Sequence, residues 1–404
     1  MNINNRVGID ESSVVNPNTT RLGKLREHFR KRRLIWIICS IIFMVLIIVI
    51  STTVALMNKT KREKTSTMET ITEIATTTST TTAITTTITT ETTSEQLFAP
   101  VIIDKNTKWK QSASTVAGGH GQGHELNQLN HPQGFYVDDD DDSIYIADTN
   151  NHRIVQWKFG VNNGEIVAGK KGNGNGIDQL HTPMDVILNK EKKYLIICDM
   201  GNYRVIKWSR QNSQDQEILI SSTFCWGLAI DNNGDLYISN WMNDEVRRWE
   251  EGDTEGTVVA GGNGYGNSCN QLDQAKQIFV DINHSVYVAD HGNNRVMKWM
   301  KDATEGILIA PGNVSNQALL SMLHPIAVIV DHTGNIYISD DTGHSIKRWL
   351  PNAIEGIAVV GKEQSGSEST HLSKPLDLSF DRHGNLYVID KENNRIQKFL
   401  IDLD

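Results

Sequence analysis

Six stretches of the sequence repeat one pattern: IYIADTNNHRIVQW (144–157), LIICDMGNYRVIKW (195–208), LYISNWMNDEVRRW (236–249), VYVADHGNNRVMKW (286–299), IYISDDTGHSIKRW (336–349) and LYVIDKENNRIQKF (386–399). Their last residues are separated by 51, 41, 50, 50 and 50 positions. A fixed period of this size is typical of proteins built from one repeated supersecondary unit. The sequence therefore predicts six copies of one structural unit.

Each copy predicts four short antiparallel strands. An apolar run such as GLAID (227–231) comes first and ends in a turn, as in Asp231–Asp235. The two strands of the repeated stretch follow, and then an apolar fourth strand such as GTVVAGG (256–262). Tight turns between alternating apolar runs indicate hairpins. Four such strands in each repeat favour a propeller blade over a solenoid turn.

The strand count predicts a closed ring. The six three-strand units are followed by only five fourth strands, and a matching run, STVAGG (114–119), precedes the first unit. We therefore expect this N-terminal strand to complete the last sheet. A closed ring has no terminal blades that need capping. The expected fold is an all-β, six-bladed β-propeller over residues 111–404, closed by an N-terminal strand.

The first 110 residues predict a membrane anchor and a spacer. Residues 34–57 are 24 positions without a charge, and about 20 apolar residues span a bilayer. Seven basic residues between 21 and 33 oppose four between 59 and 64, which favours a cytoplasmic tail at 1–33. In the expected stalk or linker, 58–110, Thr supplies 17 of the 29 residues at 65–93, a composition typical of disorder. We expect a single-pass, signal-anchor protein of the plasma membrane or secretory pathway, with an extracellular or luminal propeller.

The repeats resemble the NHL-repeat family of six-bladed propellers. The shared pattern is Y-hydrophobic-A/S-D, followed by N-x-R-hydrophobic-x-x-W/F, and it covers about residues 113–401. The third unit departs from it with Asn240 and Glu245, and the fifth with Gly343 and Ser345. Its 41-residue spacing indicates that the third unit has lost most of its Gly-rich leading loop. We expect the repeated Trp residues to pack between blades, and each repeated Arg to pair with the repeated Asp or with a nearby carbonyl.

The sequence favours a binding module, because rigid scaffolds with variable loops are common recognition surfaces. The expected partner is a protein or a glycan outside the cytosol. The candidate contact residues are aromatic positions that break the repeat: Trp226, Trp241 and Tyr265. Residues 97–404 hold 27 Lys and Arg against 40 Asp and Glu, a balance of −13, so we expect no nucleic-acid partner. RNA or ubiquitin-ligase substrate recognition, as in tripartite-motif NHL proteins, is thus the second alternative.

A lyase-like or hydrolase-like enzyme with a metal in the central channel is the first alternative, and catalysis stays open. The enzyme alternative is implied by the resemblance, because peptidyl-hydroxyglycine lyases are a branch of these propellers that binds a catalytic zinc through three His. The slot after the first-strand Pro, or its equivalent, holds no His here, since its residues are Gln133, Met184, Trp226, Lys276, Ile326 and Leu376. His131, His181 and His324 lie one or two positions away and are the candidate zinc ligands.

Calcium is the other metal considered, although no cofactor is expected. The run Asp138–Asp142 contains the candidate ligands Asp138, Asp140 and Asp142, since calcium prefers clustered oxygens. A solvated turn is the competing interpretation of this run.

Cysteines and sequons agree with a location outside the cytosol. Cys225 and Cys269 are a candidate disulfide between adjacent blades, whereas Cys198 takes a small-residue slot and is expected to be packed as a thiol. Asn283-His-Ser and Asn313-Val-Ser are candidate glycosylation sites, and we expect Asn283 and Asn313 to be exposed in loops.

Overall fold

The computed structural model describes residues 103–403, apart from 213, 312–323 and 354. Gln96–Asp404 forms one compact unit. The expected tail, the apolar run 34–57, nearly all of the stalk and the sequon at Asn313 lie outside the described residues. Within the described ranges, no helix is long and apolar enough to cross a membrane.

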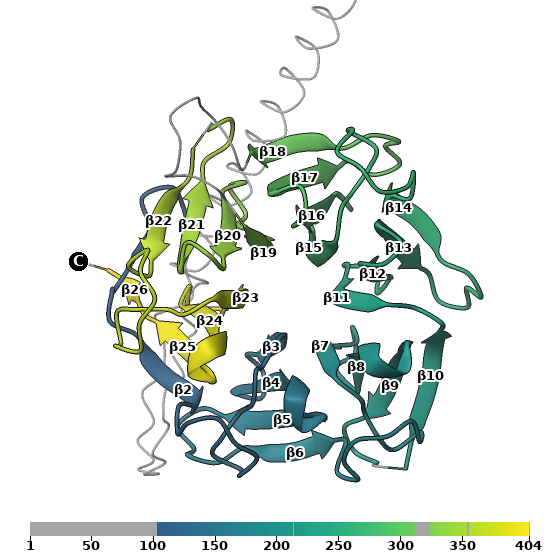
Figure 1. Ribbon diagram of the computed structural model, residues 1–404, viewed down its shortest axis with the longest axis vertical. Coiled ribbons are helices and arrows are strands. Elements are labelled where there is room, and N and C mark those ends of the chain that lie inside the picture. The colour runs from purple at the N-terminus through teal and green to yellow at the C-terminus, as the bar shows by residue number, and fades with distance from the viewer. Residues whose placement is uncertain (1–102, 213, 312–323, 354, 404) are drawn as a thin grey trace, which may run out of the picture. The chain divides into compact units, whose positions relative to one another are not determined.

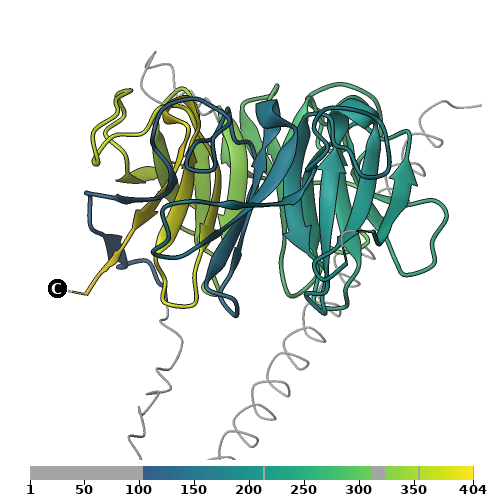
Figure 2. The same ribbon diagram turned by 90° about the horizontal axis from the view of Figure 1, so that it is seen from below.

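Six four-stranded antiparallel sheets stand around a common axis, as the sequence predicted (Figure 1). The fold is a six-bladed, all-β propeller. The innermost strands, in blade order, are β3 (Phe135–Asp138), β7 (Pro183–Leu188), β11 (Cys225–Ile230), β15 (Ala275–Val280), β19 (Pro325–Val330) and β23 (Pro375–Phe380). Figure 2, a side view, shows the strands running between two faces that consist of loops and turns.

The second and third strands of each blade come from the repeated stretch of sequence. The second strands are β4 (Ser143–Asp148), β8 (Tyr194–Asp199), β12 (Leu236–Asn240), β16 (Val286–Asp290), β20 (Ile336–Asp340) and β24 (Leu386–Asp390). The third strands are β5 (Arg153–Lys158), β9 (Arg204–Ser209), β13 (Glu245–Trp249), β17 (Arg295–Trp299), β21 (Ser345–Trp349) and β25 (Arg395–Phe399). Short 3-10 helices connect them in blades 1, 2 and 6, namely η1 (Thr149–Asn151), η2 (Met200–Asn202) and η3 (Lys391–Asn393).

The outer strands complete the blades. They are β6 (Glu165–Ala168), β10 (Gln216–Ser221), β14 (Thr257–Gly261), β18 (Ile307–Pro311) and β22 (Ile357–Val360), with β2 (Ser114–Gly118) in blade 6. We call the face at which the innermost strands begin face A. It also carries the turns between second and third strands, because Pro183 pairs with Asp199 and Pro375 pairs with Asp390. The opposite face, which carries the turns between first and second strands, is face B.

The N-terminal strand closes the ring, which confirms the prediction. β2 pairs with β25 in an antiparallel register that sets Ser114 opposite Lys398 and Gly118 opposite Arg395. A second closure was not predicted: β1 (Lys108–Trp109) pairs with β26 (Ile401–Asp402). Trp109 is buried there, its ring stacks on Phe380 at 5.7 Å between centroids, and its Nε1 donates to the Gly384 carbonyl at 2.8 Å. The propeller therefore begins before residue 111, where the sequence placed its boundary.

The repeated aromatic residues pack between blades, as expected. Trp157, Trp208, Trp299, Trp349 and Phe399 are all buried. The apolar clusters around them join neighbouring sheets, as where Tyr237 of blade 3 packs with Trp299 of blade 4. Burial of these large side chains between neighbouring sheets stabilises the contacts between blades.

The repeated Asp and Arg side chains fasten the loops that lead into the blades, and both parts of the expectation are confirmed. Four ion pairs join Asp148 to Arg153, Asp199 to Arg204, Asp290 to Arg295 and Asp390 to Arg395, at 2.7, 2.7, 2.6 and 2.7 Å. Each Arg also donates to carbonyls of its blade's leading loop, and Arg153 Nη1 reaches the His124 carbonyl at 2.7 Å. Each loop is thus held on its own blade by charge-assisted hydrogen bonds from the guanidinium group of the Arg.

The disulfide differs from the prediction. Cys225, on β11, is bonded to Cys198, on β8, and not to Cys269, which is exposed and free. The pairing with Cys269 is therefore wrong, and so is the expectation of a packed thiol at Cys198. The small-residue slot of Cys198 faces the start of the next blade's innermost strand, which brings the two sulfurs together. Cys269 lies instead in the loop that leads into blade 4.

Candidate functional site

At two positions in each blade the residue type changes from one blade to the next, although the residues beside these positions recur. The first is the second residue of each innermost strand, or its equivalent, and its residues are Gln133, Met184, Trp226, Lys276, Ile326 and Leu376. The second directly follows the repeated Asp, or Asn240, and its residues are Thr149, Met200, Trp241, His291, Asp341 and Lys391. Both positions lie on face A, beside the axis, because innermost strands begin where second strands end. We call these twelve residues the axial site.

Lys276 is the most unusual member of the axial site. Its Nζ lies over the Trp226 ring, 4.8 Å from the centroid. Among the described residues it has no hydrogen-bond acceptor and no ion-pair partner. Burial lowers the pKa of Lys276 to about 8; the charge of Lys391 lowers it further, and that of Asp341 opposes the shift. Roughly a tenth of the amine is therefore neutral at pH 7.

Aromatic and sulfur-containing side chains occupy the sector of blades 2 and 3. The rings of Trp226 and Trp241 meet edge to face, with centroids 6.4 Å apart. Trp226 and Met200 both pack against a core cluster that contains Met184. The structure thus brings together two of the three predicted contact residues. The third, Tyr265, is 74% exposed in the loop that leads into blade 4, where it bridges to Leu272.

Charged and titratable side chains occupy the sector of blades 4 to 6. His291 Nδ1 lies 3.1 Å from the Pro325 carbonyl, and its ring centroid is 6.1 Å from that of His324. Burial, followed by the positive charge of Lys276, lowers the pKa of His291 and keeps the ring neutral at pH 7. The Oδ1 atom of Asp341 is buried and has no hydrogen-bond partner within the described residues. Lys276 and Asp341 interact through space but form no ion pair.

A polar ring lies one residue further along the innermost strands. Blades 2, 4 and 6 contribute Asp185, Gln277 and Asp377, whereas blades 1, 3 and 5 contribute small residues, namely Gly134, Gly227 and Ala327. A Cβ on Gly134 would lie 2.3 Å from Asp185 Oδ1, and one on Gly227 would lie 2.0 Å from Gln277 Oε1. Small residues in alternate blades therefore leave room for three polar side chains at the axis.

The two carboxyl groups of this ring are deeply buried. Asp185 Oδ2 accepts hydrogen bonds from the Leu228 N–H at 2.8 Å and from Gln277 Nε2 at 3.0 Å. Asp377 Oδ2 accepts one from the Phe135 N–H at 3.1 Å. Burial raises the pKa of Asp377 to about 7, and burial together with the charge of Asp377 holds the pKa of Asp185 well above its usual range. Sequence reasoning missed this pair; a column-by-column comparison of the six repeats would have found it.

Comparison with known proteins agrees with this architecture. The sequence model of the NHL repeat matches residues 129–157 and 372–399, which span most of blades 1 and 6. Blades 1 and 6 therefore each carry an NHL repeat. No curated protein matches the whole sequence or part of it.

Solved structures show the same fold at low sequence identity. One is a Bacteroides thetaiotaomicron protein of unknown function, with TM-score 0.56 and 16% identity over 72% of this chain and 76% of that chain. Another is an auxiliary nutrient binding protein from Bacteroides ovatus, with TM-score 0.55 and 11% identity over 73% and 77%. A gluconolactonase from Xanthomonas campestris has TM-score 0.51 and 11% identity over 72% and 98%. At these identities the likeness concerns the fold alone.

The candidate zinc ligands of the NHL propeller lie on three different blades and have three different neighbours. His131 Nδ1 lies 3.1 Å from Asn130 Oδ1, His181 Nδ1 lies 3.2 Å from the Gly201 carbonyl, and His324 lies beside His291. In the part of the chain that the structure describes, no three His, Cys, Asp or Glu side chains are arranged to hold a metal ion. The structure does not bring the three predicted histidines together.

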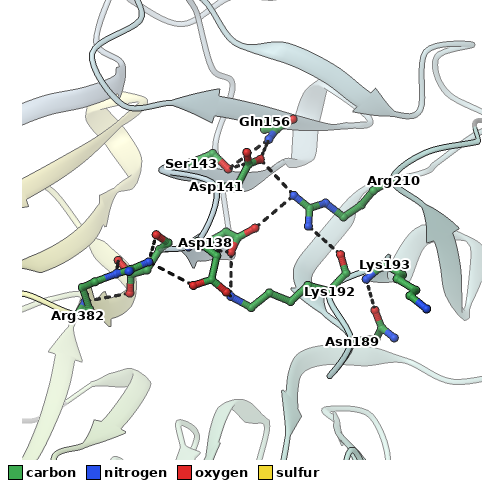
Figure 3. Close-up of polar contacts among 11 residues, drawn as sticks. Asp138, Asp141, Ser143, Gln156, Asn189, Lys192, Lys193, Arg210 and Arg382 are labelled. Atoms are coloured by element: carbon green, nitrogen blue, oxygen red, sulfur yellow. Dashed lines mark hydrogen bonds and ion pairs between the residues drawn. The ribbon is translucent and has the colours of Figure 1, made fainter. Parts of the chain in front are cut away.

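The candidate calcium ligands lie on face B, and two of them, Asp138 and Asp140, form ion pairs with basic residues of other blades (Figure 3). Lys192 of blade 2 lies 3.0 Å from Asp138 and also pairs with Asp140. Arg210 of blade 2 lies 3.3 Å from Asp138, and Arg382 of blade 6 lies 3.3 Å from Asp140. Hydrogen bonds from Lys192 and Arg382 lower the pKa of Asp140. Asp138 and Asp140 therefore join three blades, and no three acidic or histidine side chains of the described residues are arranged to hold a metal ion, which corrects the calcium interpretation. Asp142 is exposed outside this network, so the turn is solvated in part.

The described sequon is exposed, as expected. Asn283 lies in the turn between β15 and β16, on face B, and its N–H donates to Asp281 Oδ1 at 2.9 Å. A glycan there would stand on the face opposite the axial site. Glycosylation of Asn283 stays a prediction.

Proposed function

We propose that this protein is a membrane-anchored binding module whose ligand, a protein or a glycan, contacts the axial site. The observation that carries the proposal is the amine of Lys276, which lies against Trp226 without an acceptor among the described residues. A partly buried polar group without a partner is costly, and a ligand that supplies an acceptor removes the cost.

The division of the axial site into two sectors supports recognition of one oriented ligand. Trp226 and Trp241 offer ring faces and edges, which suit an apolar side chain or the face of a sugar. Lys276 and Asp341 offer one group of each charge in the neighbouring sector. Because the six blades differ at these positions, a ligand meets only one favourable orientation around the axis.

We propose that the propeller lies outside the cytosol, with residues 34–57 as the anchor and the N-terminus in the cytoplasm. The Cys198–Cys225 disulfide supports this location, because disulfides persist mainly in oxidising compartments. The exposed sequon at Asn283 also supports it. In cells, the full chain should lose an endoglycosidase-sensitive mass when it carries Asn283→Gln. An unglycosylated full chain whose N-terminal tag is digested by protease added outside intact cells would contradict the topology.

The binding proposal is tested with the full chain displayed on cells and probed with secreted proteins and glycan arrays. We expect at least one ligand whose affinity falls about tenfold or more with Lys276→Met, which keeps the aliphatic stem but removes the amine. Tyr265→Ala is the matched control, because that side chain is exposed in a loop away from the two tryptophans. Ligands that bind the wild type and Lys276→Met equally would contradict the assignment of the axial site, provided that both melt at the same temperature.

A further inference from the structure

The leading loop of a blade connects the previous outer strand to the innermost strand. In blades 1, 2, 4 and 6, where the structure describes this loop in full, it fills one position on face A. A leucine enters the core from each of these loops, and all four are completely buried: Leu129, Leu180, Leu272 and Leu372. Each leucine also forms a parallel bridge within its loop, as between Gln122 and Leu129. The loop therefore closes the outer part of its blade with one apolar anchor.

Polar groups of the blade hold the same loop from below. An Asn in the turn after the second strand donates to a loop carbonyl, as Asn151 Nδ2 does to Gly123 at 2.8 Å. A glycine before the outer strand donates its backbone N–H to a second carbonyl of the loop. Gly164 donates in this way to the Leu126 carbonyl at 2.8 Å, and Gly306 donates to the Cys269 carbonyl at 2.7 Å. At this position the blade thus presents hydrogen-bond donors, and peptide carbonyls are the groups that pair with them.

Blade 3 has the position but not the loop. β10 ends at Ser221 and β11 begins at Cys225, so only residues 222–224 connect the two blades. Glu245 replaces the loop-binding Arg, as the sequence had shown. The position is now a concave site of about 330 Å³, lined among others by Leu219, Ile238, Asn243, Trp249 and Gly256.

The groups exposed at this site are those that the leading loop covers or hydrogen-bonds in other blades. Trp249 is only partly buried, whereas Trp157, Trp208, Trp299 and Trp349 are buried. The N–H of Gly256, which corresponds to those of Gly164 and Gly306, has no hydrogen-bond partner among the described residues. Asn243 Nδ2, which corresponds to that of Asn151, makes only a 3.4 Å contact with Glu245 Oε1. One apolar surface and two carbonyl-binding donors are left open together.

Charge does not select the ligand of this site. Glu245 is already paired with Arg247 at 2.8 Å, and Arg247 also lies 3.5 Å from Glu255. Ser221 stands where Gly261 of the next blade lets Leu272 approach closely, since a Cβ on Gly261 would lie 2.7 Å from that leucine. The site is therefore slightly narrower than its counterparts.

We propose that the blade 3 site binds an extended peptide of a partner protein, as a substitute for the missing leading loop. An apolar side chain no larger than leucine lies against Leu219, Ile238 and Trp249. Backbone carbonyls of the peptide accept hydrogen bonds from Asn243 and Gly256. The occupant is a peptide because the four intact blades show what this position holds. The inference is independent of the axial site.

The test uses the full chain in detergent and a fluorescent peptide with the blade 2 loop sequence, residues 169–181. We expect saturable binding with a dissociation constant between about 0.1 and 5 mM, since one leucine and two hydrogen bonds supply the affinity. A control peptide with Leu180→Ser should bind at least about tenfold more weakly. Photo-leucine at peptide position 180 should cross-link to residues within 219–223, 238 or 249.

Two protein variants separate this site from unspecific adhesion. Leu219→Arg places a charge at the open edge of the site and should reduce binding at least about tenfold. Leu308→Arg is its control, because Leu308 is similarly exposed on the outer strand of blade 4 but lines neither this site nor its rim. No detectable binding at peptide concentrations up to about 5 mM would overturn the proposal, and so would binding that Leu219→Arg leaves unchanged. Self-association of the peptide-free chain that Leu219→Arg abolishes would also overturn it, because a second copy would then be the occupant.

Discussion

At the scale of single residues, the face A end of the axis keeps ionisable groups in surroundings that disfavour their charged forms. Lys276 lies over Trp226, and a cation–π contact of this kind stabilises the ammonium by about 0.5–2 kcal/mol. Burial acts in the opposite direction and lowers the pKa of Lys276. Perturbed groups that converge from different blades are typical of functional sites rather than of the repeated framework.

The amine of Lys276 should react at lower pH than other lysines of the propeller. Because its pKa is lowered to about 8, acetylation of Lys276 should be half-maximal near that pH. Asp341→Asn should move the midpoint further down, since the Asp341 charge favours the ammonium. Competitive isotope labelling with acetic anhydride, read by mass spectrometry for each lysine, measures this. A midpoint near 10.5, the ordinary value, would show that the amine is solvated.

The buried Asp377 should make the propeller less stable as pH rises through the neutral range. Its pKa is 3.8 when unperturbed and about 7 in the fold, so the folded state holds a proton that the unfolded state has lost. Stability from this group is therefore complete below about pH 4 and is lost as pH rises to about 7. Asp377→Asn keeps an oxygen acceptor for the Phe135 N–H and should remove this loss.

The measurement is urea unfolding of the wild type and Asp377→Asn at pH 5 and pH 8. At pH 8 the variant should unfold at a higher midpoint concentration of urea than the wild type. At pH 5 this difference should be smaller. The difference reports Asp377 together with Asp185, whose raised pKa depends partly on the charge of Asp377, whereas carboxyl groups away from this pair titrate equally in both proteins. An equal difference at both pH values would mean that its carboxyl does not titrate between them.

At the scale of elements, the leading loops explain where the repeat is kept and where it changes. The Asp and Arg of a repeat hold the loop of that blade, so blade 3, whose loop is reduced to residues 222–224, no longer requires them. Asn240 and Glu245 are therefore linked changes. In blade 5, which has Ser345 in place of Arg, Lys347 pairs with Asp340 at 2.8 Å. In blade 3 the departure from the repeat thus follows the shortened loop, and in blade 5 a nearby lysine takes the place of the arginine in the ion pair.

The Cys198–Cys225 disulfide should stabilise the contact between blades 2 and 3, where the leading loop is missing. The bond closes a segment with a sequence separation of 27, and the chain-entropy estimate for such a loop is roughly 3.5 kcal/mol. A Cys198→Ser, Cys225→Ser double variant should lose about that much free energy of unfolding. Chemical denaturation measures it, and Cys269→Ser, at an exposed free thiol, should change nothing. A mass shift on reduction that Cys269→Ser abolishes would show that the predicted pairing was right after all.

At the scale of the whole molecule, the first and the last strands of the propeller meet in the sixth blade. β2 completes its sheet, and β1 with β26 adds a second seam outside it. Ile103 and Trp109 pack in one apolar cluster with Leu386 and Phe399, which lie almost three hundred residues further along the chain. The ring therefore closes through hydrogen bonds and through apolar contacts that neither terminus can make alone.

The fold was predictable from the sequence, because period, strand pattern and strand count all depend on residues close together in the chain. The ion pairs of Asp140 with Lys192 and Arg382 were not, since they cross blades that are far apart in sequence. Of the axial site, Trp226 and Trp241 were recognised because they break the repeat. In the sequence, Lys276 stands out only as one of six residues in a slot that holds no His. Its importance depends on the side chains that surround it in the fold. The disulfide partner was missed because Cys198 occupies a position that usually holds a small buried residue.

Removal of the second seam should weaken the whole ring and not only its ends. Trp109 is 2% exposed and touches Tyr337 and Phe380, so Trp109→Ala should cost about 3–5 kcal/mol of unfolding free energy. Leu403→Ala is the control, because Leu403 directly follows β26, the partner strand of β1, and is 80% exposed. Urea unfolding gives the free energies, and hydrogen exchange locates the opening. Exchange should accelerate first in β2 and β25, since a ring opens where its ends are joined and other sheets are continuous in sequence. Faster exchange spread evenly over all six blades would mean that the seam contributes no more than any other contact between sheets.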